Sequence, residues 1–216
     1  MAFADKKKRE KAERQDDIIA AAETLFFSQG YDDVTMDDIA KELGVNKALL
    51  YYYFKDKESL YFAVVLRGLK ILDEMFKKKS GKGRTGLEKL TLGGQVYAEF
   101  AKKHPDYFQA YNYVLSKRFD LGNTENNETL QKIIDIRRET FVYTCVSVQE
   151  GISDGTIRPN VVPVEIAILF GMIFDSFSKM TPQQIEILES HGIDQHKFMV
   201  DSRDLLDYMI VNDKTG

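Results

Sequence analysis

TMDDIAKELGVNKALLYYYFKDKES, residues 35–59, is the stretch that decides the fold expected of this chain. Thr35 and Asp38 form a capping-box pattern, which predicts that a helix begins here. Apolar side chains then recur at helical spacing, at Met36, Ile39, Ala40 and Leu43. Gly44 allows the backbone to end that helix and turn, and Asn46 is a candidate N-cap for a second helix. The stretch therefore predicts two short helices joined by a tight turn.

Two short helices joined by a glycine-containing turn are typical of a helix-turn-helix, which places its second helix in the major groove of DNA. The alternative is an ordinary helical hairpin within a helical protein. The residues of the second helix favour DNA binding. On a helical wheel Leu50, Phe54 and Tyr53 fall on one side, and a second set points outward, namely Lys47, Ala48, Tyr51 and Tyr52.

This outward face has the chemistry of a DNA-reading surface. Tyrosine hydroxyls bind phosphate oxygens, tyrosine rings lie on sugars or thymine methyl groups, and lysine pairs with phosphate or guanine. We therefore assign Tyr51 to phosphate contact, and Lys47 and Tyr52 to base readout. Asp56 is the expected N-cap of the next helix, whose first N–H groups would form a phosphate clamp with Lys57. The full set of predicted DNA-contacting residues is Thr35, Asn46, Lys47, Ala48, Tyr51, Tyr52, Tyr53, Lys55 and Lys57.

Residues 14–60 resemble the N-terminal domain of the TetR family of transcriptional regulators. The matching features run along the whole stretch, at Leu25-Phe26, Gly30-Tyr31, Thr35, Ile39-Ala40, Gly44-Val45, Leu50-Tyr51, Tyr53-Phe54 and Lys57-Glu58-Ser59-Leu60. The family often has serine at the position of Asn46 and histidine at that of Tyr53, so the histidine's phosphate contact does not carry over to Tyr53. The resemblance implies a C-terminal domain that dimerises through its last two long helices. It also implies a ligand there that lowers the affinity for DNA.

The composition is that of an ordinary soluble globular protein, with 216 residues of which 30% are charged and 44% hydrophobic. The sequence shows no nucleophile–base set, metal-ligand spacing or glycine-rich phosphate loop, so we expect no enzyme activity, metal or cofactor. Cys145 is the only cysteine and lies in an apolar run, which favours an inert thiol. There is no signal-peptide pattern and no apolar run of about 18 residues, so we expect a cytoplasmic protein with no membrane partner.

The formal charge of −4 argues at first against a nucleic-acid partner, but the distribution of charge matters more than the total. Residues 1–14 hold six basic and three acidic side chains, for +3. Lys47, Lys55 and Lys57 cluster around the predicted reading helix. A solvated charge run explains residues 6–11 as well as a DNA-contacting arm does, and both interpretations stay open.

No segment of the chain shows sustained strand alternation, so the fold class is predicted to be all-α. Three helices are expected within about residues 14–54, and the basic stretch KKKSGKGRTG at 77–86 is the clearest break. Further helices are expected near 57–77, 87–103, 105–118, 127–152, 163–179, 182–190 and 197–211. We place the domain boundary after residue 56, with the arm and helix-turn-helix in 1–56 and a ligand-binding and dimerisation domain in 57–216.

Helix 163–179 is apolar almost all round, so it needs cover on two sides. Helix 197–211 has one apolar stripe and can cover one side, and a twofold partner would cover the other. The alternative is a central helix in a monomeric bundle. The predicted homodimer interface residues are Ile166, Phe170, Ile173, Phe177, Leu205 and Met209.

Seven aromatic side chains fall within residues 97–119, a density typical of a core but also of a pocket for a small apolar ligand. The predicted ligand-binding residues are Tyr97, Phe100, Tyr107, Phe108, Tyr111, Phe141 and Phe174, with Tyr111 the first choice. Asp175 is either hydrogen-bonded across the dimer interface, which we favour, or a polar anchor in this pocket.

Taken with the resemblance, these patterns predict a repressor that binds a palindromic operator in double-stranded DNA as a homodimer. A small, mostly apolar effector would release it from the operator. The alternative is a constitutive DNA-binding regulator without a small-molecule effector, for which the C-terminal bundle would be filled.

Overall fold

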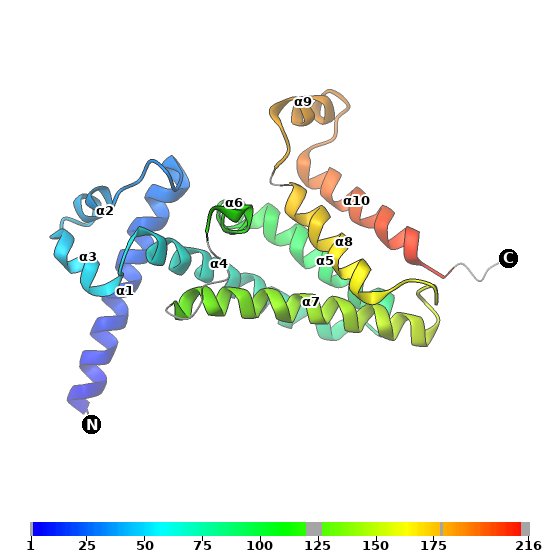
Figure 1. Ribbon diagram of the computed structural model, residues 1–216, viewed down its shortest axis with the longest axis horizontal. Helices are drawn as coiled ribbons and strands as arrows, with labels where there is room; N and C mark the ends of the chain where they lie inside the picture. Colours follow the sequence, from blue (N-terminus) through cyan, green and yellow to red (C-terminus); the bar gives the residue numbers. More distant parts are fainter. Residues whose placement is uncertain (1, 120–126, 178, 213–216) are drawn as a thin grey trace. The chain divides into compact units, whose positions relative to one another are not determined.

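The computed structural model describes residues 2–119, 127–177 and 179–212 (Figure 1). Within these residues the chain is helical apart from turns and one isolated bridge between Ile157 and Val211, so the all-α prediction is confirmed. The residues group into two compact units. The first comprises Met1–Arg67 and Asp120–Ile133, and the second comprises Gly68–Phe119 and Ile134–Gly216.

The helices of the first unit are those expected from the N-terminal sequence, with one difference. They are α1 (Ala2–Gln29), α2 (Met36–Leu43), α3 (Lys47–Tyr53) and the beginning of α4 (Lys57–Lys79). The difference is that α1 begins at Ala2 instead of near residue 14. Ion pairs one turn apart support the added turns, because opposite charges at i and i+4 stabilise a helix.

Local hydrogen bonds fix the ends of α2 and α3 as the sequence predicts. The Asp38 N–H donates to Thr35 Oγ1 at 3.2 Å and the Thr35 N–H donates to Asp38 Oδ2 at 2.9 Å, which completes the capping box. Gly44 ends α2 with φ +65°, a left-handed conformation that glycine adopts without strain. The Ala48 N–H donates to Asn46 Oδ1 at 2.9 Å and caps α3.

The second unit is a bundle built from the remaining helices. They are the end of α4, α5 (Gly86–Lys103), α6 (Pro105–Tyr113), most of α7 (Glu128–Asp154), α8 (Pro163–Phe177), α9 (Pro182–Ser190) and α10 (Gln195–Ile210). The expected helix at 105–118 is interrupted, because a π-helical turn at Val114–Arg118 follows α6. Figure 1 shows α8 and α10 side by side.

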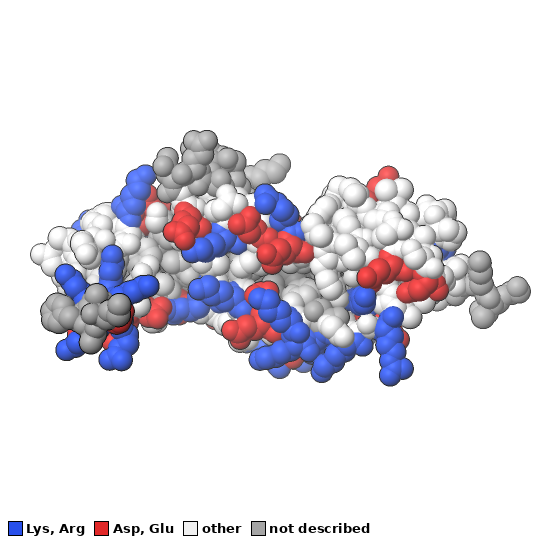
Figure 2. All heavy atoms as spheres, turned by 90° about the horizontal axis from the view of Figure 1, so that it is seen from below, with Lys and Arg blue, Asp and Glu red and all other residues white. Residues whose placement is uncertain are grey.

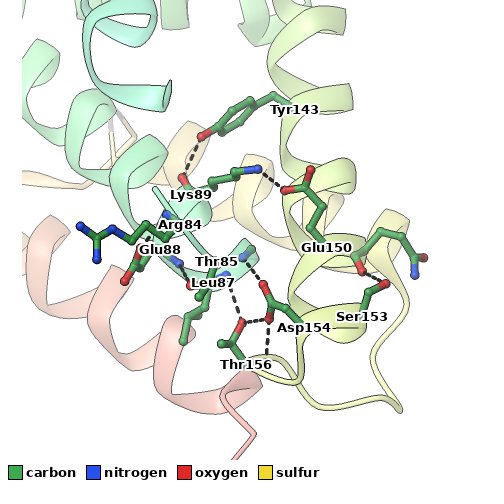
Figure 3. A network of polar contacts seen from close by, with 12 residues as sticks. Arg84, Thr85, Leu87, Glu88, Lys89, Tyr143, Glu150, Ser153, Asp154 and Thr156 are labelled. Atoms are coloured by element: carbon green, nitrogen blue, oxygen red, sulfur yellow. Dashed lines mark hydrogen bonds and ion pairs between the residues drawn. The ribbon is translucent and has the colours of Figure 1, made fainter. Parts of the chain in front are cut away.

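A polar network ties the start of α5 to the end of α7 (Figure 3). Asp154 accepts from the Gly86 N–H at 2.7 Å and from the Thr156 hydroxyl at 2.6 Å, and Lys89 Nζ lies 2.5 Å from Glu150 Oε2. Only glycine fits at position 86, because the backbone of α7 lies so close that a Cβ there would be 1.9 Å from the backbone nitrogen of Gly151. The two helices therefore meet backbone to backbone.

The boundary between the two units falls within α4, between Arg67 and Gly68, whereas the sequence placed the domain boundary after residue 56. The beginning of α4 packs with the helix-turn-helix because its apolar side chains are buried there, at Leu60, Tyr61, Phe62 and Val64. Packing and function need not divide a chain at the same residue, so the functional boundary stays a prediction.

Candidate functional site

The two faces of α3 lie as the helical wheel predicts. Leu50 has no exposed surface and Phe54 is buried, whereas Tyr51 and Tyr52 are 47% and 68% exposed. The partly buried Tyr53 packs edge-on against Tyr52, with 5.1 Å between ring centroids. A short helix held by buried apolar residues thus presents two tyrosines to solvent, where they can reach DNA.

Lys47, assigned to base readout, is held by a neighbouring carboxylate. Its Nζ lies 2.6 Å from Asp37 Oδ2 and 5.8 Å from the centroid of the Tyr51 ring. The hydrogen bond that Lys47 donates to Asp37 raises the pKa of Lys47, so the lysine stays charged. Both partners are largely exposed, and exposed ion pairs are weak and easily exchanged. Lys47 can therefore reach a base only after leaving Asp37.

Lys57 does not lie where a phosphate clamp requires. Its Nζ donates to the carbonyl oxygens of Tyr31 at 2.8 Å, Val34 at 2.9 Å and Asp32 at 3.4 Å, and it lies 4.2 Å from the centroid of the Tyr31 ring. An ammonium has three donors, and all three are used within the protein. The structure thus corrects the assignment: Lys57 anchors the α1–α2 loop. Asp56 caps α4 as predicted, accepting from the Ser59 N–H at 2.7 Å.

The other predicted DNA-contacting residues are accessible at the surface of the first unit. Thr35 and Asn46 are exposed, and their side chains cap α2 and α3. Ala48 and Lys55 are exposed without a capping role. Asn46, Ala48 and Lys55 lie within or directly next to α3 in the chain, and the contacts of all four residues with DNA stay predictions.

A cavity of about 300 Å³ lies in the second unit, between α4, α5, α6, α7 and α8. Four of the seven predicted ligand-binding residues line it, namely Tyr97, Tyr111, Phe141 and Phe174. The other three do not, which corrects the prediction. Phe100 is fully buried, Tyr107 packs against Gly68, and Phe108 faces a different hollow. Aromatic density could not separate cavity-lining rings from rings that fill the core.

The polar groups of the cavity come from four helices. Arg137 Nη2 of α7 lies 3.5 Å from Asp175 Oδ2 of α8, and Tyr97 and Tyr111 belong to α5 and α6. Burial raises the pKa of Tyr111 to about 12 and that of Tyr97 well above its usual value. Neither phenol hydroxyl is hydrogen-bonded to a residue in the described part of the chain.

Asp175 lies beside the cavity, the interpretation that the sequence favoured less. Burial raises the pKa of its carboxyl group, and the nearby Arg137 opposes that shift. In the sequence, the position of the Asp175 carboxylate within an apolar helix was the signal that pointed to a charged group at this cavity. Arg137 had no signal, because its helix carries many other charged residues.

The apolar surface of α8 lies on a different face from the one predicted. Ile166, Phe170 and Phe177 are buried within the unit and are unavailable to a partner, and Ile173 is only partly exposed. Of the predicted interface residues, only Leu205 and Met209 of α10 are exposed. The exposed apolar side chains of the two helices are Val164, Ile168, Leu169, Met172, Leu205, Tyr208 and Met209. We call this set the α8–α10 surface.

Comparison with known proteins agrees with this geometry. The model of the family described as bacterial regulatory proteins, tetR family, matches residues 18–64, which include all of α2 and α3. This part of the chain has the DNA-binding domain of the TetR family. The chain is 28% identical to the HTH-type transcriptional repressor KstR2 of Mycolicibacterium smegmatis over 172 residues, which cover 76% of each protein.

Solved structures of TetR-family proteins share the fold. A bacterial regulatory protein in the tetR family from Rhodococcus RHA1 aligns with a TM-score of 0.69 and 21% identity, covering 91% of this chain and 96% of that one. The ketosteroid transcriptional regulator KstR2 of Mycobacterium tuberculosis aligns with a TM-score of 0.68 and 16% identity, covering 92% and 95%. At these identities the likeness establishes the fold alone.

These likenesses support a DNA-binding regulator of transcription that is not an enzyme. Among the described helices none is long and apolar enough to cross a lipid bilayer. The cytoplasmic location stays a prediction from the sequence.

Proposed function

We propose that this chain is a ligand-responsive repressor that binds a palindromic operator as a homodimer. The observation that carries the proposal is the course of α4. This helix begins at Lys57, beside the helix-turn-helix, and continues without a break to residues that line the cavity, namely Leu69, Leu72 and Phe76. A ligand in the cavity therefore contacts the same helix that supports the DNA-binding helices. Repression is supported by the name of the relative from Mycolicibacterium smegmatis.

The α8–α10 surface supports the homodimer. Its seven apolar side chains lie on two adjacent helices, and Met172, Leu205 and Tyr208 are each about two-thirds exposed or more. Contiguous apolar surface of this kind marks an interaction site in a soluble protein. A second copy related by a twofold axis would cover it with the same surface and would place two α3 helices on one palindromic site.

The cavity supports an effector with a mostly apolar body and an uncharged polar end. Arg137 and Asp175 together carry no net charge, so an ionic ligand would leave one of them without its partner. The hydroxyls of Tyr97 and Tyr111 are donors without acceptors in the described structure, and a ligand carbonyl or hydroxyl oxygen would satisfy them. A ketosteroid is a suitable first compound, since one solved relative is named for this class.

Such a ligand acts on DNA binding only through a difference in its affinity for the DNA-competent and DNA-incompetent states. Selection from a pool of random duplex DNA would first identify a bound sequence. Fluorescence anisotropy on that duplex would then test release by a ketosteroid, with a long-chain carboxylate as the charged comparison. Release by the ketosteroid together with a higher melting temperature is the expected result. Binding that no compound weakens would favour a constitutive regulator.

Gly171 offers a variant that closes the cavity. It lines the cavity within α8, and a Cβ there would meet no atom within 4 Å. Gly171→Leu should fill the space without strain and improve the helix propensity, while Gly171→Ala serves as the small control. We expect Gly171→Leu to bind the selected duplex like the wild type but to lose ligand release. Ligand release that persists in Gly171→Leu would place the effector elsewhere.

A further inference from the structure

The helix-turn-helix and its surroundings carry little positive charge for a protein that binds DNA. Residues 16–57 hold four basic and nine acidic side chains, for a formal charge of −5. Two of the four lysines are already engaged, Lys47 by Asp37 and Lys57 by backbone carbonyls. Because contacts with phosphates supply much of the affinity for DNA, this region needs cations from another part of the chain.

The N-terminal half of α1 holds those cations. Residues 5–14 include six basic and three acidic side chains, for +3, and every one of these residues is exposed. We call residues 5–14 the helical arm. Figure 2 shows Lys and Arg side chains gathered around this end of α1, at the left of the view. The arm thus offsets most of the negative charge of residues 16–57.

Two of the three acidic residues of the arm are paired within it, and several of its lysines are left without an acidic partner. Glu10 pairs with Lys6 at 3.8 Å and Glu13 pairs with Arg9 at 3.3 Å. Lys7, Lys8 and Lys11 form no ion pair with any residue that the structure describes. Three exposed lysines are therefore available to an anionic partner.

Two of these lysines lie beside the reading helix. Lys11 Nζ lies 5.4 Å from the centroid of the Tyr52 ring. Lys7, one turn before Lys11, lines a shallow hollow between the arm and the end of α3 together with Lys11, Tyr52 and Tyr53. The hollow also contains Glu10, Glu13 and Asp17, and each of these is paired with an arginine or lysine of α1. The free charges of the hollow are positive.

We propose that the helical arm is a second DNA-binding element, in which Lys7 and Lys11 bind backbone phosphates next to the base pairs read by α3. The proposal rests on DNA binding through α3. Tyr52 is exposed on the reading face, so a lysine beside its ring reaches the same duplex. Ten helical residues span about 15 Å, the length of roughly four base pairs, so the arm extends the contacted site along the DNA.

The lysines of the helical arm either contact DNA or form a solvated charge run, and these two interpretations predict different results. The test compares Lys7→Ala/Lys11→Ala with Lys8→Ala/Arg9→Ala, a pair with the same loss of charge whose residues do not line the hollow. The probes are a duplex selected by the wild-type protein and an unrelated duplex. Far-ultraviolet circular dichroism checks that both variants keep the helical arm, which alanine favours.

The measured quantity is the slope of log K against log salt concentration. In the proposed homodimer, losing two phosphate contacts per protomer removes four contacts per complex. The magnitude of this slope should therefore fall by about four for Lys7→Ala/Lys11→Ala, on both duplexes, and by much less for the control pair. Hydroxyl-radical footprinting should also show loss of protection at backbone positions flanking the site.

Equal slopes for the two double variants would overturn the arm proposal while leaving DNA binding by α3 intact. A wild-type protein that selects no duplex at all would instead overturn the proposed function on which the arm proposal rests. The two failures are therefore distinguishable.

Discussion

Lys57 gives the sharpest test of the first unit, because the sequence assigns it to DNA and the structure assigns it to the protein. Lys57→Met keeps the aliphatic stem and removes the ammonium group. The variant loses two short charged hydrogen bonds to Tyr31 and Val34, a longer one to Asp32, and the contact with the Tyr31 ring. Lys55→Met is the matched control, since Lys55 is exposed and two residues away.

The expected loss of stability follows from these contacts. A hydrogen bond to a charged group contributes about 1.5–3 kcal/mol, and solvent near a partly buried ammonium lowers that value. We therefore expect Lys57→Met to reduce the free energy of unfolding by about 2–4 kcal/mol. For a chain of this size that corresponds to a fall of roughly 5–15 °C in melting temperature.

Thermal unfolding and salt-dependent DNA binding together decide between the two roles. Lys57→Met should lower the melting temperature and leave the salt slope unchanged. Lys55→Met should leave the melting temperature unchanged and reduce the magnitude of the slope by about two, as expected for one lost phosphate contact in each protomer of the proposed homodimer. The reasoning is refuted if Lys57→Met melts like the wild type and loses about two units of slope, since Lys57 would then contact DNA.

Met172→Glu should raise the dimer dissociation constant by roughly 100-fold, because an uncompensated charge in an apolar interface costs about 3 kcal/mol, and sedimentation will detect this. Ile187→Glu, at an exposed apolar residue of α9, should leave the dimer intact. Asp175→Asn should melt higher than the wild type at neutral pH, because burial raises the pKa of the Asp175 carboxyl and its ionised form is destabilising. That difference should shrink as the pH falls through the raised pKa of the folded state and disappear well below 3.8, the ordinary pKa, where the carboxyl is protonated in both folded and unfolded states. Gly86→Ala should destabilise the protein by about 3 kcal/mol, since its Cβ would meet backbone atoms, whereas Gly81→Ala meets nothing and should be neutral in thermal melts.

The sequence by itself determined the features that depend on neighbouring residues. The capping box of Thr35 and Asp38, the left-handed turn at Gly44 and the cap at Asn46 are formed within a few residues of the chain, so their patterns predict their geometry. The two faces of α3 follow from helical periodicity. The helical wheel places Leu50 on one side and Tyr51 and Tyr52 on the other, and in the structure Leu50 is buried while both tyrosines are exposed. The all-α fold class follows from the same local rules.

Only the tertiary structure decided which partners distant side chains meet. The carbonyl acceptors of Lys57 come from residues 23 to 26 positions earlier, and no spacing rule specifies that contact. Helix α8 is apolar on nearly all sides, so periodicity could not separate the buried Phe170 from the exposed Met172. Arg137 meets Asp175 because α7 packs against α8 around a cavity. Packing between helices fixes such contacts. The composition and periodicity of one helix do not specify which residues of another helix will pack against it.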